Sequence, residues 1–192
     1  MISEKEKKIE NKKRLQKKYF EETLPLRKDL EKLGLYVDKA SDFDSVIKKD
    51  KSAPGIFLKH LKEDYSLIVL WRIAHTLSYS QILITTEMID IFDDIKDDGL
   101  WWRIAQSILE LYKSNPRETK IDVDKLKLYF KNPGYYKSIS PFIYIIAYTE
   151  GKKSSPFLCK LLHMKFEDEI SERGIISETL YNLGYIKDTS TI

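Results

Sequence analysis

The sequence predicts an all-α fold built from antiparallel helix pairs that stack side by side. The segment WRIAHTL at residues 71–77 returns 31 residues later as WRIAQSI at residues 102–108. An internal repeat of this length is typical of stacked helical repeats. The chain holds only 7 Gly and 6 Pro, too few to favour a turn-rich all-β fold. Its 192 residues, of which 42% are hydrophobic, are enough to form a continuous core.

The first helix is predicted to run from Ser3 to Gly34. Ser3 and Glu6 have the spacing of a capping box, in which each side chain bonds the other residue's backbone N–H. Pro25 predicts a kink or a break near Thr23, because proline lacks the helical N–H and restricts the residue before it. Gly34 predicts a stop in the left-handed conformation.

Caps and breakers divide the rest of the chain into alternating helices and turns. Asp42 is expected to cap a short helix, and Pro54 lies in the first turn of the next, where its missing N–H costs no hydrogen bond. A longer helix is expected over 66–79. Further helices are expected over residues 87–95, 100–113, 123–130, 138–148, 156–163 and 170–183.

The apolar spacing within these helices predicts which side chains are buried. The helix over 66–79 has an apolar stripe at helical spacing, formed by Leu67, Leu70, Trp71, Ala74 and Leu77. By the repeat, Trp102 is expected to take the same buried position as Trp71. Residues 142–148 have the β-branched and aromatic composition of a strand. We predict a helix there instead, because the neighbouring segments alternate helix by helix.

These features resemble the HEAT-type α-solenoids, and small bacterial HEAT-repeat proteins in particular. The shared pattern is an acidic turn within each pair and an Arg entering each second helix: Asp64 with Arg72, Asp98 with Arg103, and Glu169 with Arg173. The resemblance covers about residues 15–185. It implies a short right-handed α-solenoid of about four helix pairs with an N-terminal capping helix. In that family the Asp and Arg often form a ladder between repeats; contact with a partner is the alternative.

The resemblance also sets the expected organisation of the chain. A charged helix over 1–34 precedes the solenoid over 35–185, and a loose tail occupies 186–192. One departure is the spacing of 40 residues from Trp102 to Phe142, its counterpart in the third pair. The third pair is therefore the least regular of the four.

Charge is distributed unevenly along the chain. The net charge is +3, but residues 1–18 hold eight Lys or Arg and three Glu, so the remaining residues carry −2. A basic segment of this kind contacts nucleic acid or an anionic surface, or is simply a solvated helix end. No apolar stretch approaches the roughly 20 residues of a membrane span, and no signal-peptide core begins the chain. A cytoplasmic protein without membrane contact is expected.

The sequence contains no motif that would carry catalysis. His60, His75 and His163 show no spacing for metal binding, and Cys159 is the single cysteine. Glycine-rich phosphate loops and nucleophile motifs are absent from the sequence. We therefore predict no catalytic residues, no metal, no cofactor and no enzymatic activity.

Two candidate partner-binding surfaces stand out. The first is an acidic cluster with only Lys96 opposing it, formed by Glu87, Asp90, Asp93, Asp94, Asp97 and Asp98. Four of these carboxylates (87, 90, 94 and 97) are spaced to share one helical stripe, and stacked like charges cost stability. Either a cationic partner balances that cost or the cluster is an ordinary solvated face.

The second surface is the predicted concave face of the inner helices. Arg72, His75 and Arg103 are expected to point there, away from the core. Trp101 follows as an exposed contact, unless the start of its helix buries it beside Trp102. Tyr135 and Tyr136, in the third turn, complete the candidates.

Three functions are compatible with these features. The first is a protein-binding module, in its most concrete version a cytoplasmic immunity protein that neutralises a cationic nuclease-type toxin. The second is a DNA-binding protein similar to HEAT-like alkylpurine DNA glycosylases, suggested by Trp71, Trp101, Arg72 and Arg103. The body of the chain carries −2, which disfavours phosphate contacts. The third is a structural scaffold or an assembly factor.

Overall fold

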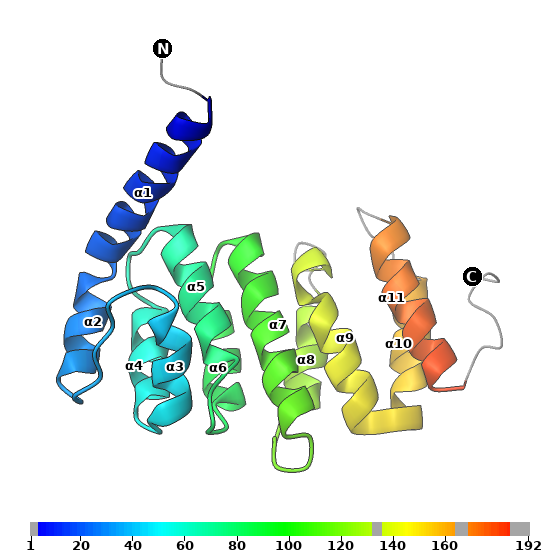
Figure 1. Ribbon diagram of the computed structural model, residues 1–192. Coiled ribbons are helices and arrows are strands. Elements are labelled where there is room, and N and C mark those ends of the chain that lie inside the picture. The colour runs from blue at the N-terminus through cyan, green and yellow to red at the C-terminus, as the bar shows by residue number, and fades with distance from the viewer. Residues whose placement is uncertain (1–3, 132–135, 164–168, 185–192) are drawn as a thin grey trace. The chain divides into compact units, whose positions relative to one another are not determined.

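The computed structural model describes residues 4–131, 136–163 and 169–184, and these are folded into helices and turns without strands (Figure 1). The chain divides into two compact units, Met1–Ile82 (unit 1) and Leu83–Ile192 (unit 2). The predicted tail over 186–192 lies outside the described residues. Within the described parts, no helix combines the length and the apolar character that crossing a membrane requires.

Unit 1 consists of five helices among its described residues: α1 (Glu4–Glu22), α2 (Leu24–Glu31), α3 (Asp42–Lys49), α4 (Ala53–His60) and α5 (Leu67–Leu77). The predicted break falls at Thr23, with Pro25 in the first turn of α2. Gly34 has φ +75°, and the Leu35 N–H donates to the Leu30 carbonyl at 3.1 Å. The predicted left-handed stop is thus confirmed, and it satisfies a carbonyl at the helix end.

The core of unit 1 lies where α4 packs against α2 and α5, and α3 packs against α5. Phe43 and Phe57 meet edge to face in this core, with ring centroids 5.5 Å apart. A buried histidine, His60, joins α4 to α2: its Nε2 donates to the Asp29 carboxylate at 3.0 Å. Lys59 also binds Asp29, at 2.8 Å. Unit 1 therefore combines an apolar core with a charged link between two helices.

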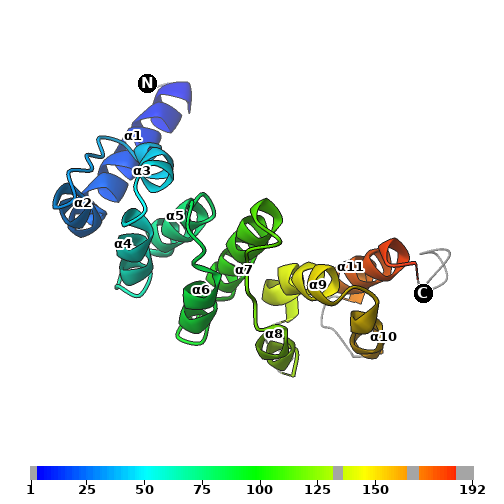
Figure 2. The same cartoon turned by 90° about the horizontal axis from the view of Figure 1, so that it is seen from below.

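Unit 2 places its helices in two rows: α6 (Thr85–Phe92), α8 (Val123–Tyr129) and α10 (Ser155–Leu162) in one, α7 (Asp98–Ser114), α9 (Tyr136–Glu150) and α11 (Glu169–Asn182) in the other (Figure 2). Each helix of the first row packs against the following helix of the second row, and α9 packs against both α7 and α11. Residues 142–148 lie inside α9, so the helix prediction is confirmed there.

Aromatic rings fill the core of unit 2. Phe92 of α6 stacks on Trp101 of α7, with ring centroids 6.1 Å apart. The same Phe92 ring lies 4.9 Å from Tyr129 of α8 and 5.3 Å from Phe142 of α9. Trp101 is only 9% exposed. The expectation of an exposed Trp101 is therefore wrong, because the start of α7 buries this ring against α6.

The two repeated tryptophans are exposed rather than buried. Trp71 and Trp102 are each 39% exposed, so their predicted burial is wrong, although their equivalence holds. The buried face of α5 includes Val69, Ile73 and Leu77, spaced four residues apart. Trp71 precedes Ile73 by two residues, a rotation of about 200° around the helix, which places it on the opposite face.

Candidate protein-binding surface

Trp102 lies on the exposed side of α7, within a helix whose other side is packed. Asp98, Trp102 and Gln106 follow one another at intervals of four residues, so they share one face. Asp98 is exposed and Gln106 is half-buried. The Arg103 guanidinium carbon lies 5.9 Å from the centroid of the Trp102 ring. An ordered helix therefore presents a large aromatic ring to solvent, one turn from a carboxylate.

The acidic patch consists of the six predicted carboxylates: Glu87, Asp90, Asp93, Asp94, Asp97 and Asp98. All six residues are exposed. They do not form one helical stripe, because α6 ends at Phe92 and residues 93–97 form the turn that leads into α7. That part of the prediction is wrong. Glu87 and Asp90 lie on the exposed side of α6, Asp93, Asp94 and Asp97 lie in the turn, and Asp98 begins α7 one turn before Trp102.

Asp90, Asp93 and Asp97 of the patch contact other groups of unit 2. Lys125 of α8 binds Asp90 at 2.9 Å and Asp93 at 3.5 Å. The hydrogen bond with Asp90 is the main cause that raises the pKa of Lys125. Asp97 caps α7, where its side chain accepts from the Leu100 N–H at 2.8 Å. The expectation that Lys96 alone opposes the cluster is thus wrong; Lys125 is too distant in sequence to be recognised there.

Arg103 is buried and does not face a partner. Its Nη2 donates to Glu110 at 2.9 Å, and both Nε and Nη2 donate to the Ser107 hydroxyl at 3.2 and 3.0 Å. Its prediction as a surface residue is wrong. The carboxylate that binds Arg103 comes from its own helix, and the expected ladder partner was Asp98. A buried guanidinium needs such partners, since desolvating an unpaired charge is costly.

Arg72 is half-buried between α5 and α3. It donates to the Asp44 carboxylate at 2.7 Å and to the Ala40 carbonyl at 3.2 Å. Thr76 of α5 donates to the other oxygen of Asp44 at 3.0 Å. The predicted ladder paired Arg72 with Asp64, so the carboxylate is a different one. The interaction fixes α5 to α3 and takes Arg72 away from a solvent-facing role.

The remaining predicted contact residues are His75, which is only partly exposed, and Tyr135 and Tyr136. His75 is half-buried and meets the Tyr79 ring edge to face, with centroids 5.2 Å apart. Lys48 of α3 lies 4.3 Å from the centroid of the same Tyr79 ring. The side chains of Tyr135 and Tyr136 lie outside the described residues. His75 thus belongs to a packed group at the end of α5.

Exposed apolar residues that the sequence analysis missed lie on the same side of α5 as Trp71. Leu67, which was predicted to be buried, is exposed. Ile68, for which no prediction was made, is exposed as well. In α7 the corresponding positions are Asp98 and Gly99. A second apolar stripe, with Val69, Ile73 and Leu77 at intervals of four residues, is the buried one in α5. Recognising this stripe in the sequence would have predicted that Trp71, and by the repeat Trp102, is exposed.

Unit 2 exposes further aromatic rings on the row that contains α7. Tyr148 of α9 is 61% exposed and Tyr181 of α11 is 50% exposed. Tyr144 precedes Tyr148 by one turn of α9. Its pKa is raised chiefly by burial, and the negative charge of Glu178 raises it further. Because α9 packs against both neighbours, Trp102, Tyr148 and Tyr181 mark one row of adjacent helices. Tyrosine and tryptophan are enriched at protein–protein interfaces.

The described residues bring together no group of three or more His, Cys, Asp or Glu side chains that could hold a metal ion. The surface around Trp102 offers an aromatic ring and the Asp98 carboxylate. No protein-family model, no curated protein and no solved structure matches this chain.

Proposed function

We propose that this chain is a protein-binding module of the α-solenoid type, related to HEAT-repeat proteins, which contacts its partner through Trp102 and the acidic patch. The observation that carries the proposal is the exposure of Trp102, 39%, on a packed helix one turn from Asp98. Tryptophan is prominent among the residues that dominate interface energetics. A ring held by an ordered helix also loses little conformational entropy on binding.

The partner that this surface favours is cationic. Carboxylates around an aromatic anchor increase the rate of encounter with a positively charged protein and select against negatively charged ones. All six carboxylates of the patch are exposed, and Lys96 and Lys125 offset only part of their charge. The narrower proposal is therefore an immunity protein that neutralises a cationic toxin in the cytoplasm without turnover of its own.

Three of the four residues that suggested the nucleic-acid alternative are buried or held by another side chain. Arg103 and Trp101 are buried, and Arg72 is held by Asp44. Trp71 is exposed, but a single ring does not make a duplex-binding surface, which generally needs several phosphate contacts. The glycosylase-like hypothesis and the scaffold hypothesis therefore enter as outcomes of the experiment.

The test is comparative capture with purified protein in extracts of the source cells. Wild type is compared with Trp102→Ala, with Glu87→Lys/Asp94→Lys, and with Glu118→Lys as a charge-reversal control outside the patch. We expect the wild type and the control to retain the same amount of one basic polypeptide. The Trp102 variant and the double patch variant should each retain at least tenfold less of it. The captured polypeptide is then purified, and its Kd for each variant is measured directly.

The same preparations are incubated with a labelled 20-base-pair DNA duplex. Binding of duplex by the wild type that survives the Trp102 and patch substitutions, with no polypeptide captured, would replace the protein-binding proposal by the nucleic-acid alternative. Equal retention of the polypeptide by all four proteins would show that Trp102 and the patch are not the contact surface, and would favour the scaffold hypothesis.

A further inference from the structure

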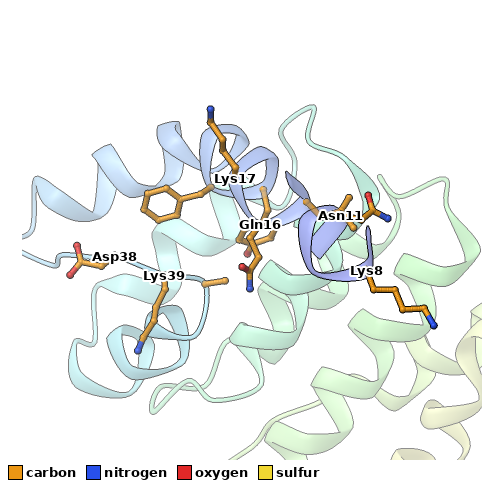
Figure 3. Close-up of a pocket in the computed structure, with 10 residues that line it drawn as sticks. Lys8, Asn11, Gln16, Lys17, Asp38 and Lys39 are labelled. Carbon is orange, nitrogen blue, oxygen red and sulfur yellow. The ribbon is translucent and has the colours of Figure 1, made fainter. Parts of the chain in front are cut away.

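Unit 1 contains a groove of about 740 Å³ between α1 and residues 38–40, which we name the α1 groove (Figure 3). Leu15, Tyr19 and Phe20 of α1 and Ala40 of the opposite segment provide its apolar lining. Leu15 is 52% exposed. A contiguous apolar lining on a helix that is otherwise charged is unusual for a purely solvated segment.

The groove follows α1 along its length. Lys8, Asn11, Leu15 and Tyr19 are spaced by three, four and four residues, so they lie on one face of the helix. The lining extends from Lys8 to Phe20, which corresponds to about 18 Å of helix, or three turns. This elongated shape suits a helical segment better than a compact small molecule.

The rim of the groove is positively charged. Lys8, Lys17 and Lys39 lie around it, with Asp38 as the opposing charge, and Figure 3 shows the lysine side chains extending in different directions from the lining. Lys8 and Lys17 form ion pairs on α1 at 3.4 and 3.8 Å, but both are almost fully exposed. Exposed pairs of this kind are worth little, so these lysines can exchange partners readily.

We propose that the α1 groove binds an acidic amphipathic helix of a partner protein. The apolar stripe of such a helix would pack on Leu15 and Phe20, and its carboxylates would meet Lys8, Lys17 and Lys39, the arrangement used in helix-in-groove recognition. This surface lies in unit 1 and is cationic, whereas the proposed partner surface around Trp102 lies in unit 2 and is acidic. The two proposals therefore stand or fall separately.

The probe is a fluorescein-labelled 16-residue peptide with Leu at helical spacing and Glu at most other positions. Two matched peptides serve as controls: one has the same composition in scrambled order, and one has Lys in place of every Glu. Fluorescence anisotropy against the full chain is expected to give at least tenfold tighter binding of the acidic amphipathic peptide than of either control. Its affinity should fall at least threefold between 50 and 300 mM salt, because exposed charges are screened.

Variants of α1 identify the binding face. Leu15→Glu is compared with Ile9→Glu, since both residues are exposed and apolar on α1 but only Leu15 lines the groove. We expect Leu15→Glu to weaken peptide binding at least tenfold and Ile9→Glu less than twofold. A second comparison sets Lys8→Glu/Lys17→Glu against Lys13→Glu/Lys18→Glu, the latter two lysines being exposed outside the groove. Circular dichroism shows whether each variant is folded.

Four results would overturn the proposal. Equal binding of the three peptides would show that the groove does not recognise an acidic amphipathic helix. Equal loss in the Leu15 and Ile9 variants would show that the whole of α1, not the groove, attracts the peptide. Wild-type binding to phosphatidylserine vesicles without peptide preference, or a concentration-dependent dimer that Leu15→Glu dissociates, would assign the groove to a membrane surface or to a second copy of the chain.

Discussion

The two copies of the repeated segment, in α5 of unit 1 and α7 of unit 2, agree in exposure and differ in what their charged residues bind. Trp71 and Trp102 are equally exposed, and the Ile-Ala dipeptides that follow two residues later are fully buried in both units. Thr76 and Ser107, four residues beyond each Arg, are also fully buried. The repeat therefore predicts how each position is oriented with respect to its own core.

The binding partners of the two arginines do not repeat. In unit 1 the carboxylate is Asp44, which comes from α3 and also accepts from Thr76. In unit 2 it is Glu110, two turns further along α7 itself. One arrangement joins two helices, whereas the other is local to one helix. An internal repeat thus specifies the position of the arginine on its helix but not its partner, which depends on the elements that pack nearby.

The largest expected effect separates the adjacent tryptophans of α7. Trp101→Ala removes a buried ring that stacks on Phe92, so it should lower the free energy of unfolding by about 3–5 kcal/mol. Trp102→Ala removes an exposed ring and should cost less than about 1 kcal/mol. Urea denaturation followed by circular dichroism measures both. Equal losses would contradict the assignment of Trp101 to the core and Trp102 to the surface.

The second expected effect tests the two arginine arrangements. Asp44→Ala should cost about 2 kcal/mol, because it removes the carboxylate that accepts from both Arg72 and Thr76. Glu110→Ala should cost about 1 kcal/mol or less, because Ser107 still accepts from Arg103 and Glu110 is itself partly exposed.

A double-mutant cycle provides the control for this comparison. Adding Arg72→Met to Asp44→Ala removes the unpaired charge, so the double variant should be less destabilised than the sum of the two single variants. Additive losses at these two sites would show that Asp44 and Arg72 are not coupled, despite the 2.7 Å separation of Asp44 Oδ2 and Arg72 Nη2.

The helices and two of their boundaries could be predicted from local sequence, whereas burial required tertiary information. Pro25 and Gly34 determined a break and a stop through the restrictions on their own backbone. The stripe through Trp71 failed because α5 is apolar on more than one side, so several stripes fit the same spacing. Only the packing of α5 on α3 and α4 distinguishes them.

The candidate surface was predicted in composition and not in arrangement. Its carboxylates were identified because they are close in sequence, but Lys125, which binds two of them, is more than 30 residues away. The α1 groove was missed for a similar reason, since its lining combines α1 with residues 38–40. Contacts between distant segments leave no periodic signal in one sequence.

The third expected effect concerns acid and unit 1. Hydrogen bonds from Lys32, Lys59 and His60 lower the pKa of Asp29 well below its ordinary value. The unfolded chain therefore binds the proton more tightly, so this stabilisation is present above pH 4 and is lost as the pH falls towards the folded pKa.

Asp29→Asn measures this contribution directly. Its deficit in unfolding free energy relative to wild type should be largest near pH 6 and should shrink at pH 3 and below. Asp64→Asn, an exposed substitution in the same unit, provides the control and should show no such trend. A deficit for Asp29→Asn that stays constant across this range would show that the carboxylate acts through its shape and not through its charge.

The smallest expected effect on stability is at Lys125. The lysine–carboxylate pairs of the two units differ in exposure: Asp29, which binds Lys59 in unit 1, is half-buried, whereas Asp90 and Asp93, which bind Lys125 in unit 2, are largely exposed. Lys125→Ala should lower the free energy of unfolding by only about 0.2–1 kcal/mol, the range for exposed ion pairs.

Lys125→Ala also makes the net charge around the acidic patch more negative by one. A cationic partner of this patch should consequently associate faster with the variant at low salt, and this advantage should vanish at high salt because exposed charges are then screened. The association rate of Lys125→Ala with the partner is measured by stopped flow. Lys120→Ala, which removes an exposed lysine of unit 2 outside the patch, is the control. An unchanged or slower association rate for Lys125→Ala would show that the charge of the patch does not guide the partner.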